Sequence, residues 1–389
     1  MSITIEHEPL TRVRRVASDV AKAYAEEVDL DARFPSEAID ALREEGMLSA
    51  LVPTSLGGGG SSIDVVAEAC FELGRSCGAT GLIFAMHQIQ VASIVRHFDG
   101  APWFDTYLRR LAQEQRLIAS ATSEVGTGGD MGRSIAALTV DADGGCFFEK
   151  QAPTVSYGSF ADDILTTLRR SPDAEPGDQV IVLTHAEQMT LEPTGIWNPL
   201  GMRGTCSPGY LLRARFAADQ MLPTPFAEVS GRTMTPLAHV LWSHVWLGIA
   251  TDAFDRAREY VRGLAKKTPG ERPPAAQRLS HLMSEVSLLR AEVRSGLRDF
   301  VDGMHGGEGE ALSTMATALR FNNLKIAASE QAPRICQGAL GICGIAGYMN
   351  GTPYSIGRHL RDSLSGSLMV ANDRIHDTNA SLLLIAKDV

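Results

Sequence analysis

Small hydroxyls and glycines gather in one segment with the makings of a binding site. Residues 119–130 read Ala-Ser-Ala-Thr-Ser-Glu-Val-Gly-Thr-Gly-Gly-Asp, so two neighbouring hydroxyls precede three glycines. Bare backbone amides and short hydroxyls suit the polar edge of a cofactor or a phosphate. A simple turn explains the same spacing equally well. The other glycine run, residues 57–60, follows a predicted helix rather than a strand, which favours a plain loop over a dinucleotide-binding motif.

Composition narrows the classes of function. The chain has 389 residues and a net charge of −10, which argues against a nucleic-acid-binding surface because phosphate neutralisation needs clustered Lys and Arg. Six scattered cysteines form no paired motif, so neither a zinc site nor a disulfide framework is expected. No apolar run reaches the length of a membrane span, and the first ten residues do not resemble a signal peptide. We therefore expect a cytoplasmic protein without membrane partners.

The elements that must position the glycine segment fall into three regions. Residues 36–45, 65–74 and 82–98 show helical spacing of apolar residues. From about residue 116 the chain becomes rich in turns, with candidate strands at 137–140, 146–148, 164–168, 180–184 and 210–216. Because these strands follow one another without helices between them, we predict an antiparallel barrel or sandwich.

The third region returns to helices. Apolar residues recur at three-to-four spacing in one stripe, which is typical of a bundle helix: Leu279, Leu282, Val286, Leu289, Val293 and Leu297. Two more helices are expected, one ending before Pro333 and one beginning after Ile356. The predicted class is α+β, mostly α, with a helical domain at 1–115, a β domain at 116–228 and a helical bundle at 229–389.

Five motifs in sequence order resemble one family. The segment 123–130 resembles the Thr-Glu-Pro-x-Ala-Gly-Ser-Asp segment of acyl-CoA dehydrogenases. Four other pieces are similar to that family's elements: 35–60 to its N-terminal helices and following glycine loop, 154–162 to its Trp-Ile-Thr-Asn strand, 200–205 to its Leu-Gly-x-Arg turn, and 344–348 with 358–362 to its C-terminal Gly-Gly-x-Gly and Arg-Asp elements. The family's fold has the same order of regions and ends in a four-helix bundle.

The resemblance implies a flavin site. It implies that Ser123 faces the flavin pyrimidine, with the backbone of Ala121 and Thr122 beside it. It also implies that Ser156, next to Val155, lies near flavin N5, the atom that accepts hydride; an ordinary strand hydroxyl is the alternative. The implied cofactor is FAD, and the implied assembly is a homodimer or homotetramer with the FAD site shared between subunits.

Several positions depart from the family pattern. Thr154 stands where a tryptophan usually shields the flavin, and Gly129 replaces a serine that grips ligand. Lys266 stands in the arginine element that reaches a neighbouring subunit's FAD pyrophosphate, and Gln277 has the spacing of that element's glutamine. Lysine keeps the charge but loses the bidentate fork of arginine. Weaker adenosine contacts leave FMN as an alternative to FAD.

The catalytic base is the largest departure. Removal of an α-proton from an acyl thioester normally uses a desolvated glutamate, but residues 361–377 contain none. Asp373 is the nearest carboxylate and is our candidate base, with Asp377 second; a helix-capping role for Asp373 explains it equally well. His376 stands in the region where flavin monooxygenases of this fold have His-Asp pairs, although an exposed or packed histidine is the more usual explanation. Asp362 is expected to form a structural ion pair.

Three functions follow from these patterns. The first is an FAD-dependent acyl-thioester dehydrogenase that acts on an acyl-CoA or a carrier-bound acyl chain and passes electrons to a transfer partner. The second is a flavin monooxygenase or oxidase that uses reduced flavin, oxygen and another small-molecule substrate. The third is a non-catalytic relative retained for binding.

Overall fold

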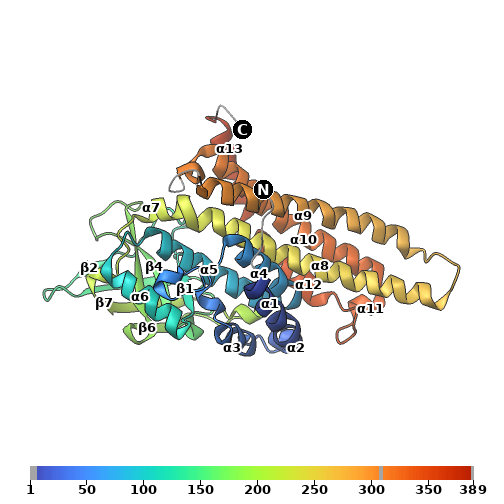
Figure 1. The fold of residues 1–389 in the computed structure, drawn as a ribbon. Coiled ribbons are helices and arrows are strands. Elements are labelled where there is room, and N and C mark those ends of the chain that lie inside the picture. Colours follow the sequence, from blue (N-terminus) through green and yellow to red (C-terminus); the bar gives the residue numbers. More distant parts are fainter. Residues whose placement is uncertain (1–6, 306–309, 387–389) are drawn as a thin grey trace.

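A computed structural model describes residues 7–305 and 310–386 of the chain. The β strands lie at one end of the molecule and the long helices extend to the other (Figure 1). The order of helices, β unit and helices is confirmed. The N-terminal helices are α1 (His7–Arg15), α2 (Lys22–Leu30), α3 (Ser36–Glu44), α4 (Ile63–Ser76), α5 (Gly78–His97) and α6 (Pro102–Glu114).

Helix α5 is the centre of the N-terminal region. Its length and composition would allow it to cross a membrane, but 89% of its most apolar stretch is buried inside the protein. It packs against α4, the long helix α8 (Thr235–Lys267) and β1 (Ile118–Ala121). Its burial on all sides is what a core helix shows.

The β unit consists of two sheets rather than one. The first has the strand order β1, β4 (Asp163–Arg169), β5 (Gln179–His185). The second has the order β2 (Thr139–Val140), β3 (Cys146–Ala152), β7 (Tyr210–Phe216), β6 (Met189–Pro193).

The prediction of a wholly antiparallel unit was wrong for one pair. β1 and β4 run parallel, with Ile118 opposite Asp163, whereas the other strand pairs are antiparallel. A parallel pair needs a long connection, and here the connection contains β2 and β3 of the second sheet. The predicted alternation in β7 is confirmed: Leu212, Ala214 and Phe216 are buried.

Three long helices form the C-terminal region, namely α8, α9 (Ala275–His305) and α10 (Met315–Cys343). The shorter α12 (Gly357–Leu364) packs against α8 and α10. In the predicted stripe of α9, Leu282, Val286, Leu289 and Val293 are buried. The predicted helix end before Pro333 was wrong, because α10 continues through that proline. Packing against α8 and α9 sustains the helix although proline lacks one backbone donor.

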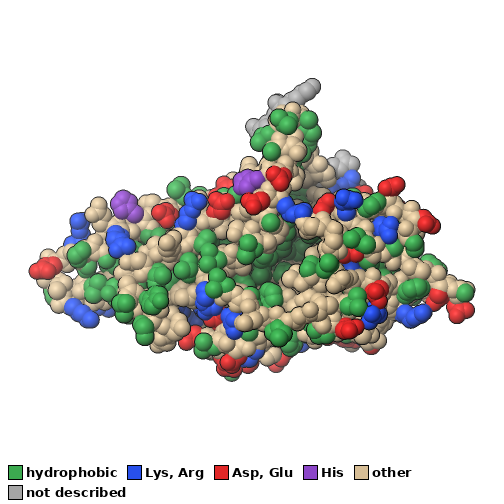
Figure 2. Space-filling model, turned by 180° about the vertical axis from the view of Figure 1, so that it is seen from behind, with side chains coloured by type: hydrophobic (Ala, Val, Ile, Leu, Met, Phe, Trp, Pro, Cys, Tyr) green, Lys and Arg blue, Asp and Glu red, His purple; other side chains and the backbone are tan. Residues whose placement is uncertain are grey.

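The last described helix, α13 (Asn372–Leu383), stands away from the body of the molecule (Figure 1). It follows the short helices α11 (Ile345–Tyr348) and α12, and its end carries the exposed apolar residues Leu383, Leu384 and Ile385. Figure 2 shows apolar side chains on this projection.

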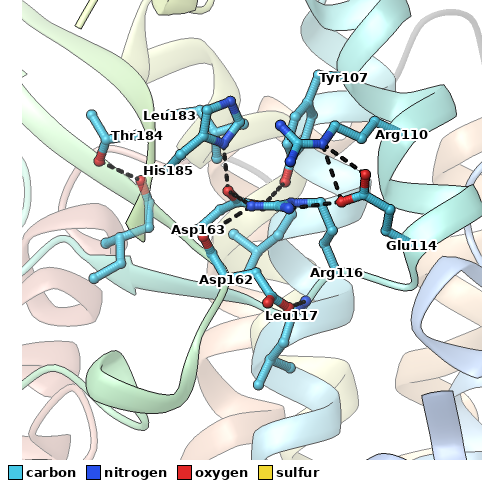
Figure 3. A network of polar contacts seen from close by, with 12 residues as sticks. Tyr107, Arg110, Glu114, Arg116, Leu117, Asp162, Asp163, Leu183, Thr184 and His185 are labelled. Atoms are coloured by element: carbon cyan, nitrogen blue, oxygen red, sulfur yellow. Dashed lines mark hydrogen bonds and ion pairs between the residues drawn. The ribbon is translucent and has the colours of Figure 1, made fainter. Parts of the chain in front are cut away.

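A buried charged network fastens the start of β1 (Figure 3). The fully buried carboxylate of Asp163 accepts two hydrogen bonds of 2.7 Å from Arg116, one of 2.7 Å from the Tyr107 hydroxyl and one of 2.6 Å from Nδ1 of His185. Burial opposes its ionisation, but the bonds from Arg116 and His185 outweigh burial and hold the pKa of Asp163 below its usual value. This network joins α6, β4 and β5 and so fixes where β1 begins.

Candidate functional site

A cavity of about 560 Å³ lies where the β unit meets the segment between α12 and α13. Its volume is within the usual range of small-molecule sites. Its lining comes from four places: Leu82 of α5, the glycine segment with Met131, the two β-unit loops that carry Ser156 and Ser207, and the α12–α13 segment that ends at Arg374. Residues from the N-terminal helices, the β unit and the C-terminal region therefore meet in one hollow.

The end of β1 brings Ser123 to the cavity. Its hydroxyl donates a 3.3 Å hydrogen bond to the carbonyl of Thr154. The next residue, Glu124, is buried and turns inward, where it accepts bonds from the Ser134 hydroxyl and from the amides of Ile135 and Ala136. Glu124 therefore folds the glycine loop back on itself and is not available to a ligand in the cavity.

A second hydroxyl, that of Ser156, does not stand alone. Ser207 donates a 2.9 Å hydrogen bond to it, and Thr205 lies 2.8 Å from Ser207, oxygen to oxygen. The single proton of the Thr205 hydroxyl can go either to Ser207 or to the carbonyl of Met202, which lies 2.9 Å away. All four residues line the cavity, and Thr205 and Ser207 are each only 2% exposed.

The backbone around these hydroxyls is strained. Seven described non-glycine residues have positive φ, and four of them line the cavity or adjoin its hydroxyls: Tyr157, Met202, Cys206 and Val370. Such conformations cost about 1–3 kcal/mol each and persist where the surrounding structure enforces them, often at functional sites. The sequence alone gave no sign of this cluster, because none of the four is Gly, Asn or Asp.

Arg374 covers the glycine segment. A Cβ built on Gly129 would lie 3.3 Å from Nε of Arg374, and one built on Gly128 would lie 3.2 Å from a terminal guanidinium nitrogen. Both glycines also have positive φ. A side chain at either position would be strained and crowded, so these glycines allow the guanidinium to lie close to the loop.

The predicted residues separate into two groups. Ser123, Gly129 and Ser156 line the cavity, and Ala121, Thr122 and Val155 are their chain neighbours just behind it. Lys266 and Gln277 are exposed at the opposite end of the molecule, near the turn between α8 and α9 (Figure 1). The expected contact of Lys266 and Gln277 with FAD remains a prediction. These two residues could make it only with the FAD of a neighbouring subunit.

Asp373 lies outside the cavity. It is exposed in the first turn of α13 and is not part of the lining, while its neighbour Arg374 is. Asp377 and His376 are exposed as well. The geometry of the single chain therefore gives the proposed base Asp373 no contact with the cavity, and its catalytic role stays a prediction.

The expected ion pair of Asp362 has a different form. Arg361 pairs with Asp29 instead, through both terminal nitrogens. Asp362 is buried, accepts a 2.7 Å hydrogen bond from the amide of Met202 and lies 3.9 Å from Arg358. Burial raises the pKa of Asp362 to about 6, against the opposing effects of Arg358 and the Met202 amide. It supports the strained turn behind the cavity.

Sequence reasoning missed much of the lining, including its polar and aromatic members Trp197, Ser207 and Arg374. Trp197 supplies an aromatic wall and donates from its ring nitrogen to the carbonyl of Arg203 at 2.9 Å. The absence of a tryptophan at 154 was apparent from the sequence, but the presence of another at the same cavity was not. Only the proximity of residue 207 to the Leu-Gly-x-Arg turn offered a signal for Ser207.

The cavity suits a flavin. Short hydroxyls and close-lying glycines can meet a polar ring edge, Arg374 offers positive charge, and Leu82, Met131 and Trp197 offer apolar and aromatic surface for a ring system. Among residues 7–305 and 310–386, no group of three or more His, Cys, Asp or Glu is placed to hold a metal.

Comparison with known proteins agrees with this fit. The acyl-CoA dehydrogenase N-terminal domain matches residues 6–115 and the C-terminal domain matches residues 231–374. Dibenzothiophene monooxygenase of Mycolicibacterium goodii is 28% identical over 59% of this chain and 57% of its own, so this chain matches little more than half of that relative's length. A probable acyl-CoA dehydrogenase, YngJ of Bacillus subtilis, is 26% identical over 90% of this chain and 91% of its own.

A solved structure shows the same fold. FMN-bound TdsC from Paenibacillus sp. A11-2 superposes with a TM-score of 0.81 at 20% sequence identity and covers 97% of each chain. The fold, the two matching domains and the full-length relatives agree with one another. The chain belongs to the acyl-CoA dehydrogenase family of flavoprotein oxidoreductases.

Proposed function

We propose that this protein is a monooxygenase that uses reduced flavin and oxygen to oxidise a small, largely apolar molecule. One observation carries the proposal: among the residues that the structure describes, the cavity lining contains hydroxyls and arginines but no Asp, Glu or His. An acyl-thioester dehydrogenase needs a base beside the substrate's α-carbon. Oxygen transfer does not need a carboxylate there.

In this proposal the chain's residues bind the flavin and exclude water. Ser123 and Ser156 would hold the polar edge of the ring by hydrogen bonds, and Arg374 would offset the negative charge that flavins carry on their phosphate and, when reduced, on the ring. Trp197 and the apolar lining exclude water from the reacting face. When bound, reduced flavin supplies the two electrons by which dioxygen gives one oxygen atom to the substrate and the other to water.

FMN is the flavin that we propose, in place of the FAD expected from the sequence. Lys266 and Gln277, the two residues expected at the adenosine side, are exposed at the far end of this chain and could reach a flavin only in another copy. TdsC was solved with FMN bound. We also propose a cytoplasmic homo-oligomer, whose partner in electron supply is a separate flavin reductase.

Acyl-thioester dehydrogenation is the second candidate. It is supported by relatives named as acyl-CoA dehydrogenases that match this chain over most of its length. It would require Asp373 to reach the cavity, or a carboxylate from a second copy to enter it. FAD and an electron-transfer partner would then replace FMN and oxygen.

Two reactions of the purified protein separate these candidates. In the first, the protein receives enzymatically reduced FMN, isotopically labelled dioxygen and either dibenzothiophene or indole, with catalase present to remove free peroxide. We expect mass spectrometry to find one labelled oxygen atom in the probe, and none when the protein is omitted. In the second, the flavin-loaded protein receives acyl-CoAs of several lengths without oxygen. Loss of the oxidised flavin band there, with no oxygen transfer in the first reaction, would overturn the proposal in favour of the dehydrogenase.

A further inference from the structure

The hydrogen bond between Ser207 and Ser156 has a defined donor and a defined acceptor. Each hydroxyl has one proton to donate and two lone pairs that accept. The single proton of Ser207 has two acceptors, Ser156 at 2.9 Å and the Thr205 carbonyl at 3.2 Å, and the shorter of these bonds occupies one lone pair of Ser156. Because the proton on that bond belongs to Ser207, the proton of Ser156 itself remains available to the cavity that it lines.

Thr205 reinforces this direction. Its oxygen lies 2.8 Å from that of Ser207, and its own proton can reach either Ser207 or the Met202 carbonyl. Hydrogen bonds in series polarise one another, and the effect is larger away from water. Thr205 and Ser207 are both 2% exposed, so when Thr205 gives its proton to Ser207 rather than to Met202, the chain from Thr205 through Ser207 makes Ser156 a stronger donor than an isolated serine.

The chain ends inside the protein and does not carry protons. Beyond Thr205 its contact is the carbonyl of Met202, which has no proton to give. The amide of Met202 is held by Asp362 at 2.7 Å, and the Thr205 carbonyl accepts a 2.8 Å bond from the amide of Tyr157. The three hydroxyls are thus fixed by the two strained loops that carry them, which favours an orienting role over a proton relay.

We propose that Ser207 and Thr205 are positioning residues that make Ser156 a hydrogen-bond donor to the cavity, so that the site discriminates between oxidised and reduced flavin. This inference rests on the proposed place of flavin beside Ser156. Flavin N5 accepts hydrogen bonds when oxidised but carries a proton when reduced. A hydroxyl whose proton is directed outward therefore binds the oxidised ring more strongly than the reduced ring.

The test compares the dissociation constants of the full-length protein for FMN and for chemically reduced FMN, measured by anaerobic calorimetry. Substitution Ser207→Ala should weaken the binding of oxidised FMN by roughly three- to tenfold, the worth of about one hydrogen bond. The binding of reduced FMN should change by much less. Thr205→Val should act in the same direction with a smaller effect, and Thr205→Ser, which retains the hydroxyl, should leave the ratio of the two constants unchanged.

A double substitution sharpens the result. If Ser207 acts through Ser156, then Ser207→Ala should have little further effect on that ratio in a Ser156→Ala background. If Ser207→Ala weakened the binding of both flavin forms equally, or changed neither, the ratio of the two dissociation constants would stay the same. Either result would show a merely structural role and overturn the inference. If Ser207→Ala does not fold, the same outcomes apply to Thr205→Val. Failure of the unsubstituted protein to bind either form would overturn the flavin placement as well.

Discussion

Two polar networks of the β unit differ in charge and in openness: one lies at the start of β1, and the other lies in the loops that line the cavity. At the start of the strand, Asp163 is fully buried and receives four hydrogen bonds from Arg116, Tyr107 and His185 (Figure 3). In the loops that line the cavity, Ser156 and Ser207 form a neutral chain that opens into it. The carboxylate of Asp163 is fully occupied by its neighbours, whereas the hydroxyl of Ser156 can still donate a hydrogen bond to a ligand.

This difference between the two networks indicates which of them can take part in chemistry. A carboxylate with a shifted pKa is often a sign of an active site, and the pKa of Asp163 is lowered. Every group around it is already committed to another, however, so it stabilises the fold. The hydroxyls show no such electrostatic signal, but they lie among strained residues at the edge of a cavity. The site here is marked by a hydroxyl that still has a proton to donate, rather than by a carboxyl with a shifted pKa.

The largest expected effect comes from the closed network. Replacing Asp163 with asparagine removes the buried countercharge of the Arg116 guanidinium and leaves it only the half-exposed Glu114 as an ion-pair partner. Removal of one partner from a buried ion pair costs about 3–5 kcal/mol, and we expect that loss in the free energy of unfolding measured by urea denaturation. The matched control is Asp178→Asn, which breaks the exposed pair with Arg170 and should cost less than about 1 kcal/mol. Similar losses in both variants would contradict the assigned structural role.

The next effect is a pH dependence that differs in sign between two buried carboxyls. The pKa of Asp362 is raised to about 6 in the folded protein, above the value of about 3.9 in an unfolded chain. Its contribution to stability is therefore present below pH 4 and is lost as the pH rises through 6. The pKa of Asp163 is lowered, so its contribution is present above the unfolded value and is lost as the pH falls.

Substituting asparagine for Asp362 or for Asp163 removes the pH-dependent contribution of that carboxyl to stability, so the two variants should differ in the sign of their pH dependence. Relative to the unsubstituted protein, Asp362→Asn should gain about 2–3 kcal/mol in unfolding free energy between pH 4 and pH 7, from 1.36 kcal/mol per unit of pKa shift. Relative to the unsubstituted protein, Asp163→Asn should lose stability as the pH rises toward the unfolded value of about 3.9, and should change little further from pH 5 to pH 7. Denaturant titrations at several pH values measure both differences. A difference for Asp362→Asn that does not vary with pH would show that this carboxyl is already ionised in the fold.

The order of the regions and much of their detail could be predicted from the sequence. Periodic apolar spacing predicts α9, and alternation predicts β7, because each element buries one face. The same reasoning failed for the pairing of β1 with β4, since parallel pairing depends on a long connection that local patterns do not describe. It also failed at Pro333, where packing against neighbouring helices sustains α10.

The site was harder to predict than the fold. Ser123, Gly129 and Ser156 came from a resemblance between motifs, and the structure brings these three to one cavity. Asp373 was chosen because it was the nearest carboxylate in the sequence, but on a helix adjacent residues point in different directions. One position decides that Arg374 lines the cavity while Asp373 faces solvent.

This difference between neighbours gives the smallest effect and the closest control. Arg374→Ala removes a cation that lies over Gly128 and Gly129, and we expect the dissociation constant for FMN to rise roughly tenfold, which is about 1.4 kcal/mol. The loss should shrink as salt is added, because the arginine is exposed and its attraction is screened. Asp373→Asn changes the charge one residue away and should leave flavin binding within about twofold, since exposed charges outside a site contribute little. If Asp373→Asn instead abolished turnover while Arg374→Ala left flavin binding intact, the assignment would be contradicted. Asp373, rather than Arg374, would then be the residue that faces the bound molecules.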